Sequence, residues 1–403
     1  MKKKRIFIAI HYMEIGGAER SLLGLLNAID TNIYDIDLFV YRHTGEFMEL
    51  IPKKINLLKE IKKYTTIERP ISEIFFGGYV DIAVARFIAK LVSMIYIRKN
   101  GLKDNTSVFQ YISDFTTPLL PELTDFGEYD VAISFLAPHN IVRDKIKAGK
   151  KIAWIHTDYS TVAINSEMEF PVWNSFDHIV SISESARFAF LGKFPGLKDK
   201  VVVIENILSP QFVREQAHLE DVSSEMPFEQ GLVRLLSVGR YSPAKNFDNV
   251  PYICSNLIKS GINVKWYIIG FGGNEDQIND NIKDSGMEGR VILLGKKSNP
   301  FPYMKECDFY VQPSRYEGKA VTVREAQILH KLVAITNFPT SKSQLEDKID
   351  GVIVPMDNVG ATKGLMNLIL DKKLQSRLIN NLHTRDYGNE EEIVKLYELI
   401  SLS

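Results

Sequence analysis

Short apolar runs rich in β-branched and aromatic residues alternate along this chain with longer stretches in which apolar residues recur every three or four positions. The first pattern is typical of buried strands and the second of helices. Strands that alternate with helices form parallel sheets joined by right-handed crossovers. The predicted strands are RIFIAI, DIDLFVY, VAISFL, KIAWIH, HIVSIS and VVVIENI, and then VRLLSVG, VKWYIIG, VILLG, DFYVQPS, LVAIT and GVIVP.

A polar stretch over residues 208–230 separates these two series of strands and lacks a strand pattern. We place a hinge near Asn206 to Pro210. The fold prediction is an α/β protein with two Rossmann-like, doubly wound domains that face each other across a cleft, over residues 1–207 and 208–384, followed by a C-terminal segment, 385–403. Ligands of such sheets bind beyond the carboxyl ends of the strands, where the strand order reverses. Polar motifs that directly follow strands are therefore the candidates for a site.

Two such motifs lie in the first series of strands. Gly16 and Gly17 follow the first strand, and a helix is expected to begin near Ala18, so that the backbone could approach an anionic ligand closely. His156 ends the strand KIAWIH, where an imidazole can hydrogen-bond a sugar hydroxyl or a phosphate and can titrate near neutral pH. A plain glycine turn and a structural histidine are the alternatives.

Two further motifs lie in the second series. Arg240 and Lys245 follow VRLLSVG on one loop and suit a diphosphate, because arginine binds oxygens through a bidentate fork and lysine acts as a point charge. Two solvated loop cations are the alternative. The stretch GFGG after VKWYIIG is weak evidence for a nucleotide loop when taken alone.

The stretch SRYEGKAVTVREAQ places Glu317 on a turn after a strand and Glu325 inside the helix that follows. We expect the backbone N–H groups of Lys319, Ala320 and Val321 to face a phosphate at the start of this helix. Glu325 could accept hydrogen bonds from ribose hydroxyls. Two glutamates at this spacing are weak evidence alone, and their position after a strand strengthens it.

Composition limits the class of protein. The chain has 403 residues, 45% hydrophobic and 25% charged, and 49 basic residues balance 50 acidic ones, so there is no general preference for nucleic acid. Cys254 and Cys307 are expected to be buried thiols in a reducing compartment. No apolar run is long enough for a transmembrane helix or a signal peptide, so we expect a cytoplasmic protein. Asp35 and Asp37 form a D-x-D pattern, but they open an apolar strand and we do not interpret them as a metal site.

Residues 51–103 differ from the rest of the chain because they carry 11 Lys and Arg against 4 Asp and Glu, a net charge of +7. Within this segment, YVDIAVARFIAKLVSMIYIRK is predicted to form a long amphipathic helix with basic residues among the apolar ones. Such a helix can lie on an anionic membrane surface, here the inner face of the cell membrane. It can equally pack its apolar face on the core of the first domain and expose a basic face. Both interpretations stay open.

These motifs together resemble a GT-B glycosyltransferase of the large retaining family known as family 4, or glycosyl transferases group 1. The resemblance covers nearly the whole chain. GGAER after the first strand resembles the family's N-terminal signature, VGRYSPAKNFD its Arg-x4-Lys segment, VILLGKKSNPFPYMKECDFYVQPSRYEG its C-terminal domain, and Glu317 with Glu325 its E-x7-E motif. Lys319-Ala320 departs from the family, which usually has an aromatic or aliphatic residue there, followed by a proline or a small residue.

The resemblance implies an enzyme that moves a hexose from a nucleoside-diphosphate sugar, with UDP as the favoured nucleotide, to a hydroxyl of a glycan or polyprenyl-linked acceptor in bacterial cell-surface polysaccharide synthesis, without a metal or other cofactor. Arg240 and Lys245 would bind the diphosphate, Glu317 would lie at the hexose and Glu325 at the ribose, and His156 would face the donor sugar. The first domain would bind the acceptor, and the helix in 385–403 would cross back onto it. The contacts implied on the phosphate side are Gly17, Lys319, Ala320, Val321 and Thr322.

Catalysis would then rest on stabilising the charge of the leaving diphosphate by Arg240, Lys245 and a helix N-terminus. Front-face attack, with the acceptor deprotonated by the leaving phosphate, is how retention is usually explained in this family. A non-catalytic GT-B subunit that binds an acceptor or a partner enzyme is the main alternative. A dinucleotide oxidoreductase would need a G-x-G-x-x-G motif after the first strand, which is absent.

Overall fold

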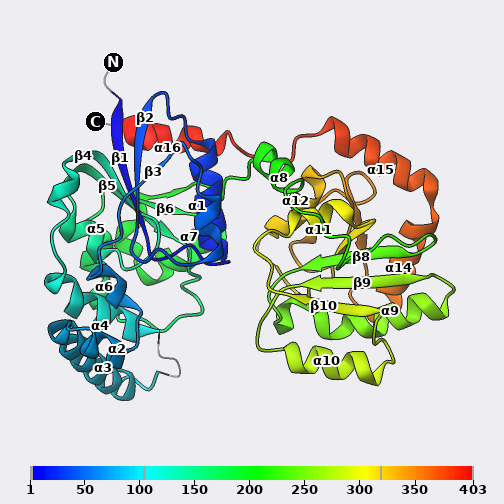
Figure 1. Ribbon diagram of the computed structural model, residues 1–403, viewed down its shortest axis with the longest axis horizontal. Coiled ribbons are helices and arrows are strands. Elements are labelled where there is room, and N and C mark those ends of the chain that lie inside the picture. Colours follow the sequence, from blue (N-terminus) through cyan, green and yellow to red (C-terminus); the bar gives the residue numbers. More distant parts are fainter. Residues whose placement is uncertain (1–2, 103–105, 318–319, 402–403) are drawn as a thin grey trace. The chain divides into compact units, whose positions relative to one another are not determined.

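The structure is a computed structural model that describes residues 3–102, 106–317 and 320–401. The chain divides into two compact units (Figure 1). The first unit comprises the chain up to Ile207 together with the segment from Glu390 onward, and the second unit comprises Leu208–Asn389.

The first unit is built on a parallel sheet with the strand order β3-β2-β1-β4-β5-β6-β7. Each strand predicted in the first series is present, and the structure adds the two-residue edge strand β3, which is too short to show a periodic pattern. The strands are β1 (Lys4–Ile10), β2 (Tyr34–Val40), β3 (Asn56–Leu57), β4 (Tyr129–Ser134), β5 (Ala148–Ile155), β6 (His178–Ser181) and β7 (Val201–Val203).

Helices complete the first unit, and its C-terminal helix packs beside its first strands. Lys4 Nζ donates to the carbonyl of Ile400 at 3.3 Å, and the rings of Tyr34 and Tyr397 stack with centroids 5.0 Å apart. The helices are α1 (Gly17–Ala28), α2 (Ile71–Phe76), α3 (Val80–Lys99), α4 (Ser107–Thr116), α5 (Asn140–Lys145), α6 (Ser166–Asn174), α7 (Glu184–Lys193) and α16 (Glu392–Ser401).

The second unit is built on a parallel sheet with the strand order β10-β9-β8-β11-β12-β13. Its strands are β8 (Val233–Val238), β9 (Val264–Ile269), β10 (Val291–Gly295), β11 (Phe309–Gln312), β12 (Leu332–Thr336) and β13 (Val352–Val354). Its helices are α8 (Pro210–Gln216), α9 (Val250–Lys259), α10 (Glu275–Asp284), α11 (Phe301–Glu306), α12 (Val321–Ile328), α13 (Ser341–Gln344), α14 (Asn358–Leu370) and α15 (Lys372–Thr384).

Successive strand residues of the second unit enter two different cores, because side chains alternate between the faces of a sheet. Leu235 of β8 packs in a core with residues of α9 and α14, whereas the next residue, Leu236, packs in a core with residues of α8, α11 and α12. Both faces of the sheet are therefore covered by helices (Figure 1). The thiols of Cys254 and Cys307 are buried and free, as predicted, and burial raises the pKa of each to about 12.

The strand order reverses at one place in each sheet. We call these places switch points. The first switch point lies between β1 and β4, and the second lies between β8 and β11. Loops that leave adjacent strands in opposite directions open a crevice at such a point, where ligands of this architecture bind. A ligand site is therefore expected at either of the two switch points.

Helix α3 departs from the usual arrangement of a surface helix. Most of its large apolar side chains are exposed, including Phe87 at 57%, Met94 at 62% and Ile95 at 67%, whereas Ile82 and small or polar residues such as Ala89 and Ser93 are buried. Ile82 and Ala83, near its start, pack in the core of the first unit, so the helix packs on that core in part, whereas most of its large apolar side chains lie outside it. No helix in the described part of the chain is long and apolar enough to cross a bilayer. We call the exposed residues the α3 stripe, and they are Val80, Val84, Phe87, Ile88, Leu91, Met94 and Ile95.

Candidate functional site

Lys245 and Glu317, predicted from separate motifs, meet at the second switch point. Lys245 ends a short 3-10 helix (Pro243–Lys245) in the loop after β8, and Glu317 lies in the loop after β11. Lys245 Nζ lies 2.5 Å from Glu317 Oε1, and the two side chains are only 19% and 11% exposed. The structure therefore brings one predicted cation and one predicted acid together in a half-shielded position.

Glu317 is held in place by further hydrogen bonds to the same oxygen. Its Oε1 accepts from Ser314 Oγ at 2.6 Å and from Gln312 Nε2 at 3.1 Å, and the carbonyl oxygen of Gln312's amide accepts from Tyr310 Oη at 2.7 Å. Within the described residues, Glu317 Oε2 accepts no hydrogen bond. One carboxylate oxygen thus fixes the side chain, and the other can accept from a ligand hydroxyl.

The loop that carries Lys245 is fixed to the end of β11. Arg315 grips Asp248 with two N–H groups, at 2.9 and 2.6 Å, and also donates to the carbonyl of Pro243 at 2.6 Å. Asn246 adopts a positive φ of 60° and donates from its side-chain amide to the carbonyl of Pro313 at 2.8 Å. Sequence analysis missed these residues, although Arg315 follows a strand just as Glu317 does.

Arg240 lies in the same loop and is exposed. Across the described ranges, its guanidinium has no hydrogen-bond or ion-pair partner. A guanidinium held near a switch point without an internal carboxylate can pair with an external anion, and its fork geometry suits two phosphate oxygens.

The N-terminus of α12 was predicted to leave backbone N–H groups open to a phosphate, and the structure agrees with this for only some of them. Helix α12 begins at Val321, and among the described side chains none caps its N-terminus, so Val321 and Thr322 have N–H groups that can face an anion. The N–H of Ala320, however, donates to Gln344 Oε1 at 2.8 Å, so the expectation that it is open to a phosphate is wrong. Lys319 lies outside the described residues.

Glu325 lies on the inner side of α12 and is fully buried, with 0% exposure. Burial raises the pKa of Tyr310 above its usual range, and the negative charges of Glu325 and Glu317 add to this effect. Both glutamates of the E-x7-E motif therefore lie close enough to one tyrosine to act on its ionisation. Their roles at the ribose and the hexose stay predictions.

The glycines of the GFGG stretch have a packing role in the second unit. A Cβ atom on Gly270 would overlap the carbonyl of Gly239, and one on Gly272 would overlap the carbonyl of Tyr241. The loops after β8 and β9 approach each other so closely that side chains do not fit between them. Tyr241 N–H donates to the carbonyl of Phe271 at 2.8 Å across this contact.

In the first unit, Gly17 is the first residue of α1 and is exposed. A Cβ atom added there would meet nothing within 4 Å, so packing inside the chain does not require glycine at this position. The fold therefore gives no reason for a glycine at this position. Close approach of a ligand to the backbone, the predicted role of Gly17, would give one.

His156 directly follows β5, and its ring centroid lies 4.7 Å from that of Phe135. Its Nε2 is buried and has no partner within the residues that the structure describes. Burial lowers the pKa of His156 to about 3, so the expectation that it titrates near neutral pH is wrong. At physiological pH it is a neutral imidazole that can exchange hydrogen bonds but carries no charge.

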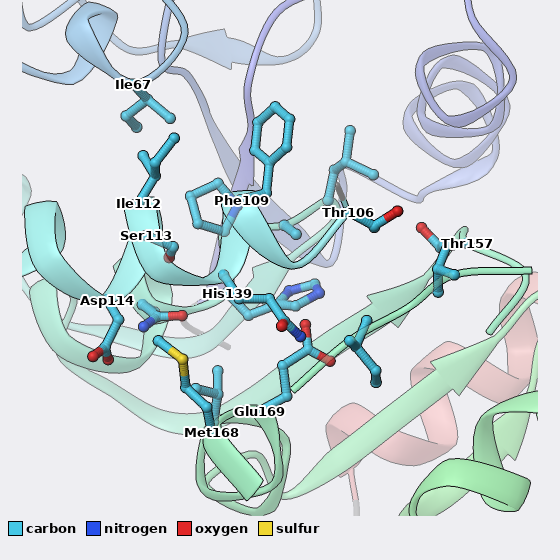
Figure 2. A pocket seen from close by; sticks show the side chains of 18 of the residues that line it. Ile67, Thr106, Phe109, Ile112, Ser113, Asp114, His139, Thr157, Met168 and Glu169 are labelled. Atoms are coloured by element: carbon cyan, nitrogen blue, oxygen red, sulfur yellow. The ribbon is translucent and has the colours of Figure 1, made fainter. Parts of the chain in front are cut away.

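A pocket of about 340 Å³ lies at the first switch point (Figure 2). Most of the residues that line it follow β1, β4 and β5 or belong to α4 and α6, such as His11, His139 and Glu169, and Ile67 and Glu68 come from the segment between β3 and α2. Sequence analysis missed this pocket. His11 directly follows the first strand, so the rule applied to the other motifs would have selected it.

Asp37 of the D-x-D pattern is a structural residue, as predicted. Its carboxylate accepts from Arg5 Nη2 at 3.0 Å, from Asn56 Nδ2 at 2.6 Å and from Tyr129 Oη at 2.7 Å. No group of three or more His, Cys, Asp or Glu residues in the described part of the chain is arranged to hold a metal ion.

Known proteins resemble this chain in sequence and in fold. Residues 223–385 match the family Glycosyl transferases group 1. An N-acetylgalactosaminyltransferase of Campylobacter jejuni, which acts on N-acetylgalactosamine-N,N'-diacetylbacillosaminyl-diphospho-undecaprenol, is 28% identical over 188 residues, 46% of this chain and 49% of the relative. The poly(ribitol-phosphate) alpha-N-acetylglucosaminyltransferase of Staphylococcus aureus is 23% identical over 233 residues, 57% of this chain and 43% of the relative. The chain thus matches about half the length of these two relatives.

The fold comparison covers nearly the whole chain. The crystal structure of Anabaena Alr3699/HepE in complex with UDP and glucose matches 99% of this chain and 100% of its own, with a TM-score of 0.64 and 14% identity. Two doubly wound units, each built on a parallel sheet, define the GT-B class of fold. The GT-B fold predicted from the sequence is confirmed, and the second unit resembles the glycosyl transferases of group 1 over residues 223–385.

Proposed function

We propose that this protein is a retaining, metal-independent glycosyltransferase that moves a hexose from a nucleoside-diphosphate sugar to a hydroxyl of a glycan or polyprenyl-linked acceptor. UDP is the proposed nucleotide, and bacterial cell-surface polysaccharide synthesis is the proposed setting. The names of the two relatives support this choice, because one acts on a diphospho-undecaprenol and the other on poly(ribitol-phosphate).

The observation that carries the proposal is the arrangement of charges at the second switch point. Lys245 is held against Glu317 by a loop that Arg315 clamps, and the unpartnered Arg240 lies in the same loop. A lysine ammonium has three donors, so Lys245 can keep Glu317 and still bind a phosphate oxygen. The uncapped start of α12 adds N–H donors and a positive dipole end.

These groups fit the charge that develops during transfer. The bond between the anomeric carbon and the diphosphate breaks, the electron pair leaves with the phosphate oxygen, and the sugar becomes oxocarbenium-like. Arg240, Lys245 and the N–H groups of α12 stabilise the leaving diphosphate. The acceptor oxygen attacks the same face of the sugar and its proton passes to the leaving phosphate, which gives a glycoside of unchanged anomeric configuration and a nucleoside diphosphate. Fixed cations supply the positive charge that a metal ion supplies in other transferases.

A thermal-stability panel tests the donor. UDP, GDP, UDP-glucose, UDP-N-acetylglucosamine, UDP-N-acetylgalactosamine and GDP-mannose are compared with and without EDTA. A nucleotide present at 100 times its Kd should stabilise the protein by about 2.7 kcal/mol, and EDTA should not change this. Absence of stabilisation by every nucleotide, or stabilisation that EDTA abolishes, would contradict the proposal.

We also propose that the α3 stripe contacts an anionic membrane surface. Contiguous exposed apolar patches commonly mark interaction sites. Phe75 and Phe76 of α2, 50% and 86% exposed, add to the apolar surface, and the exposed cations Lys90, Arg98 and Lys99 lie on α3 itself. Apolar side chains beside lysine and arginine suit the boundary between acyl chains and anionic headgroups.

The inner side of α3 explains why this helix turns its apolar side outward. Arg86 is buried and donates to the carbonyl of Thr66 at 2.8 Å, so the polar side of the helix is tied to the unit. Rotating α3 to bury the stripe would leave this guanidinium without its partners. The outward stripe is therefore fixed by the packing of α3.

Liposome flotation tests the membrane contact. The protein should float with vesicles that contain phosphatidylglycerol and not with pure phosphatidylcholine vesicles, and Phe87→Asp with Ile95→Asp should abolish flotation. Phe188→Asp, at another exposed apolar residue of the first unit (83% exposed), is the control and should float normally. If the stripe variant floats as well as the control, the stripe serves another partner.

A further inference from the structure

The pocket at the first switch point has walls suited to a neutral ligand. Phe109 and Ile112 of α4 lie on one side of it, and Met168 and Glu169 of α6 lie on the other, near His139 (Figure 2). Its volume of about 340 Å³ falls within the range of small-molecule sites, roughly 300–1,000 Å³. No lysine or arginine occurs among the described residues that line it, so a phosphate would find no counter-charge there.

Two ionisable groups that line the pocket, His139 and Glu169, are shifted by burial toward their neutral forms, while the carboxylates of Glu68 and Asp114 also line it. Burial lowers the pKa of His139 to about 3, and its Nδ1 lies 2.8 Å from Ser134 Oγ. Burial raises the pKa of Glu169, whose Oε2 accepts from Tyr159 Oη at 3.3 Å and from Trp173 Nε1 at 3.4 Å. The His139 ring lies against Trp173, with centroids 4.3 Å apart. Aromatic surfaces with a few polar atoms are typical of a site for an uncharged polar ring.

His11 lines the pocket and is oriented by Glu68. Its Nδ1 lies 2.8 Å from Glu68 Oε1. A carboxylate can only accept a hydrogen bond, so the proton of the neutral imidazole resides on Nδ1 and the lone pair on Nε2. The Nε2 atom is buried, in a residue only 8% exposed, and has no partner among the described residues. In the neutral form of the ring, this atom can only accept a hydrogen bond, and a ligand hydroxyl can supply the donor.

Ser113 of α4 presents a second atom of this kind to the same pocket. Its Oγ is buried and lacks a hydrogen-bond partner within the described ranges. A buried polar atom without a partner costs about 1–3 kcal/mol. Gln110 Nε2, which can only donate, is a third such atom among the described residues that line the pocket. A set of atoms that includes a donor, a hydroxyl and an imidazole nitrogen points to a ligand whose hydroxyl groups can both donate and accept.

We propose that this pocket binds a neutral, hydroxyl-bearing sugar ring of the acceptor, that His11 Nε2 accepts a hydrogen bond from one of its hydroxyls, and that Glu68 is the positioning residue that fixes the tautomer. This inference rests on the proposed function, because a transferase of this kind needs a place for the sugar that it extends. It adds the residues that hold that sugar and the direction of the hydrogen bond.

Long-range ¹H–¹⁵N NMR of the histidine rings tests the tautomer in the full-length protein. We expect His11 to carry its proton on Nδ1. Octyl β-glucoside, octyl β-galactoside and octyl N-acetyl-β-glucosaminide, below their micelle concentrations, serve as neutral sugar probes, and at least one should shift the His11 Nε2 signal. n-Octanol, which lacks the ring, should not. A proton on Nε2, a shift with n-octanol as large as with the glycosides, or no shift with any glycoside would overturn the inference.

Variants separate this inference from the donor site. Glu68→Gln replaces the carboxylate by an amide that can donate as well as accept, so the ring proton is no longer restricted to Nδ1, and the variant should weaken glycoside binding about tenfold while the protein stays folded. His11→Phe should weaken it as much. His43→Phe is the matched control, because His43 also has a buried Nε2 without a partner in the described part of the chain but does not line the pocket, and it should bind normally.

Stabilisation by UDP is measured on the same samples. UDP binding that persists while glycosides fail to bind the wild-type protein contradicts the pocket alone. If UDP does not stabilise the wild-type protein, the proposed function is contradicted instead. Unchanged glycoside affinity in both Glu68→Gln and His11→Phe would exclude His11 as the acceptor of the hydrogen bond.

Discussion

The two switch points of this protein share a topology and differ in their chemistry. The second switch point presents an ion pair, Lys245 with Glu317, and an arginine without an internal partner, Arg240. The first presents imidazoles that stay neutral, His139 and His156, and a shielded carboxyl group, Glu169. Burial accounts for the difference, because it disfavours isolated charge in the first unit, whereas the second keeps its charges paired or in contact with solvent. This contrast supports the two proposals, an anion at the second switch point and a neutral ring at the first.

The strongest test of this contrast is Lys245→Ala at the charged switch point. Removing one group that stabilises the leaving diphosphate should lower the transfer rate about 10²–10³-fold, the usual cost of losing such a donor. Steady-state transfer from a UDP-sugar measures the effect, and circular dichroism shows whether the fold persists. Lys363→Ala, at an exposed lysine of α14, is the control. Turnover like that of the wild type in Lys245→Ala would remove Lys245 from the diphosphate site.

The neutral switch point makes a prediction about acid stability. In the folded protein the pKa of His156 is about 3, against about 6.5 in an unfolded chain. Between these values the unfolded state binds more protons, so the free energy of unfolding falls as the pH falls below 6.5. At pH 5 this loss amounts to about 2 kcal/mol for this histidine, at about 1.36 kcal/mol per unit of pKa difference.

Urea unfolding at pH 7 and pH 5 measures this loss through the fluorescence of Trp154 and Trp173 in the first unit. His156→Phe should reduce the difference between the two pH values, while His218→Phe, at an exposed histidine, should leave it as in the wild type. An equal pH dependence in His156→Phe and in the wild type would show that His156 is not held neutral by burial.

A smaller effect is expected from Arg315→Ala, which keeps Lys245, Glu317 and Arg240 and loosens the loop that carries Lys245 and Arg240. Losing charge-assisted hydrogen bonds to Asp248 should weaken UDP binding about tenfold, or about 1.4 kcal/mol. Isothermal titration calorimetry measures it, and a double-mutant cycle with Asp248→Ala isolates the pair. Independent, additive effects of the two substitutions would show that the pair does not hold the loop.

The fold was predictable from the chain to the level of strand order along the sequence, because strands buried on both faces are continuous apolar runs. The strand β3 was not, because Asn56 and Leu57 are too few to show a period. The contact between Lys245 and Glu317 could be expected only in outline. Both follow strands, but which loops touch depends on β8 and β11 being neighbours in the sheet.

The properties that depend on burial were beyond the sequence. His156 was expected to titrate near neutral pH, and its surroundings, such as Phe135, come from another strand. The Ala320 N–H was expected to be open, and Gln344, which accepts from it, lies on a different helix. The pocket was missed for the same reason, since His11 and Glu169 are far apart along the chain and only the sheet topology brings them together.

Helix α4 stands between two of the features described above. One side of it, with Phe109 and Ser113, lines the pocket, and Tyr111 contacts Tyr96 of α3 with ring centroids 5.9 Å apart. With α3 lying on a bilayer, a single layer of helix would separate the headgroups from the sugar pocket, and a helix with its side chains is roughly 10 Å thick. The pair α3 and α4 would then fix the distance between the membrane surface and the pocket. An acceptor whose lipid stays in the bilayer would need a linker long enough to cover this height, so the length of the diphosphate and the first sugars would decide which residue of a growing chain is extended.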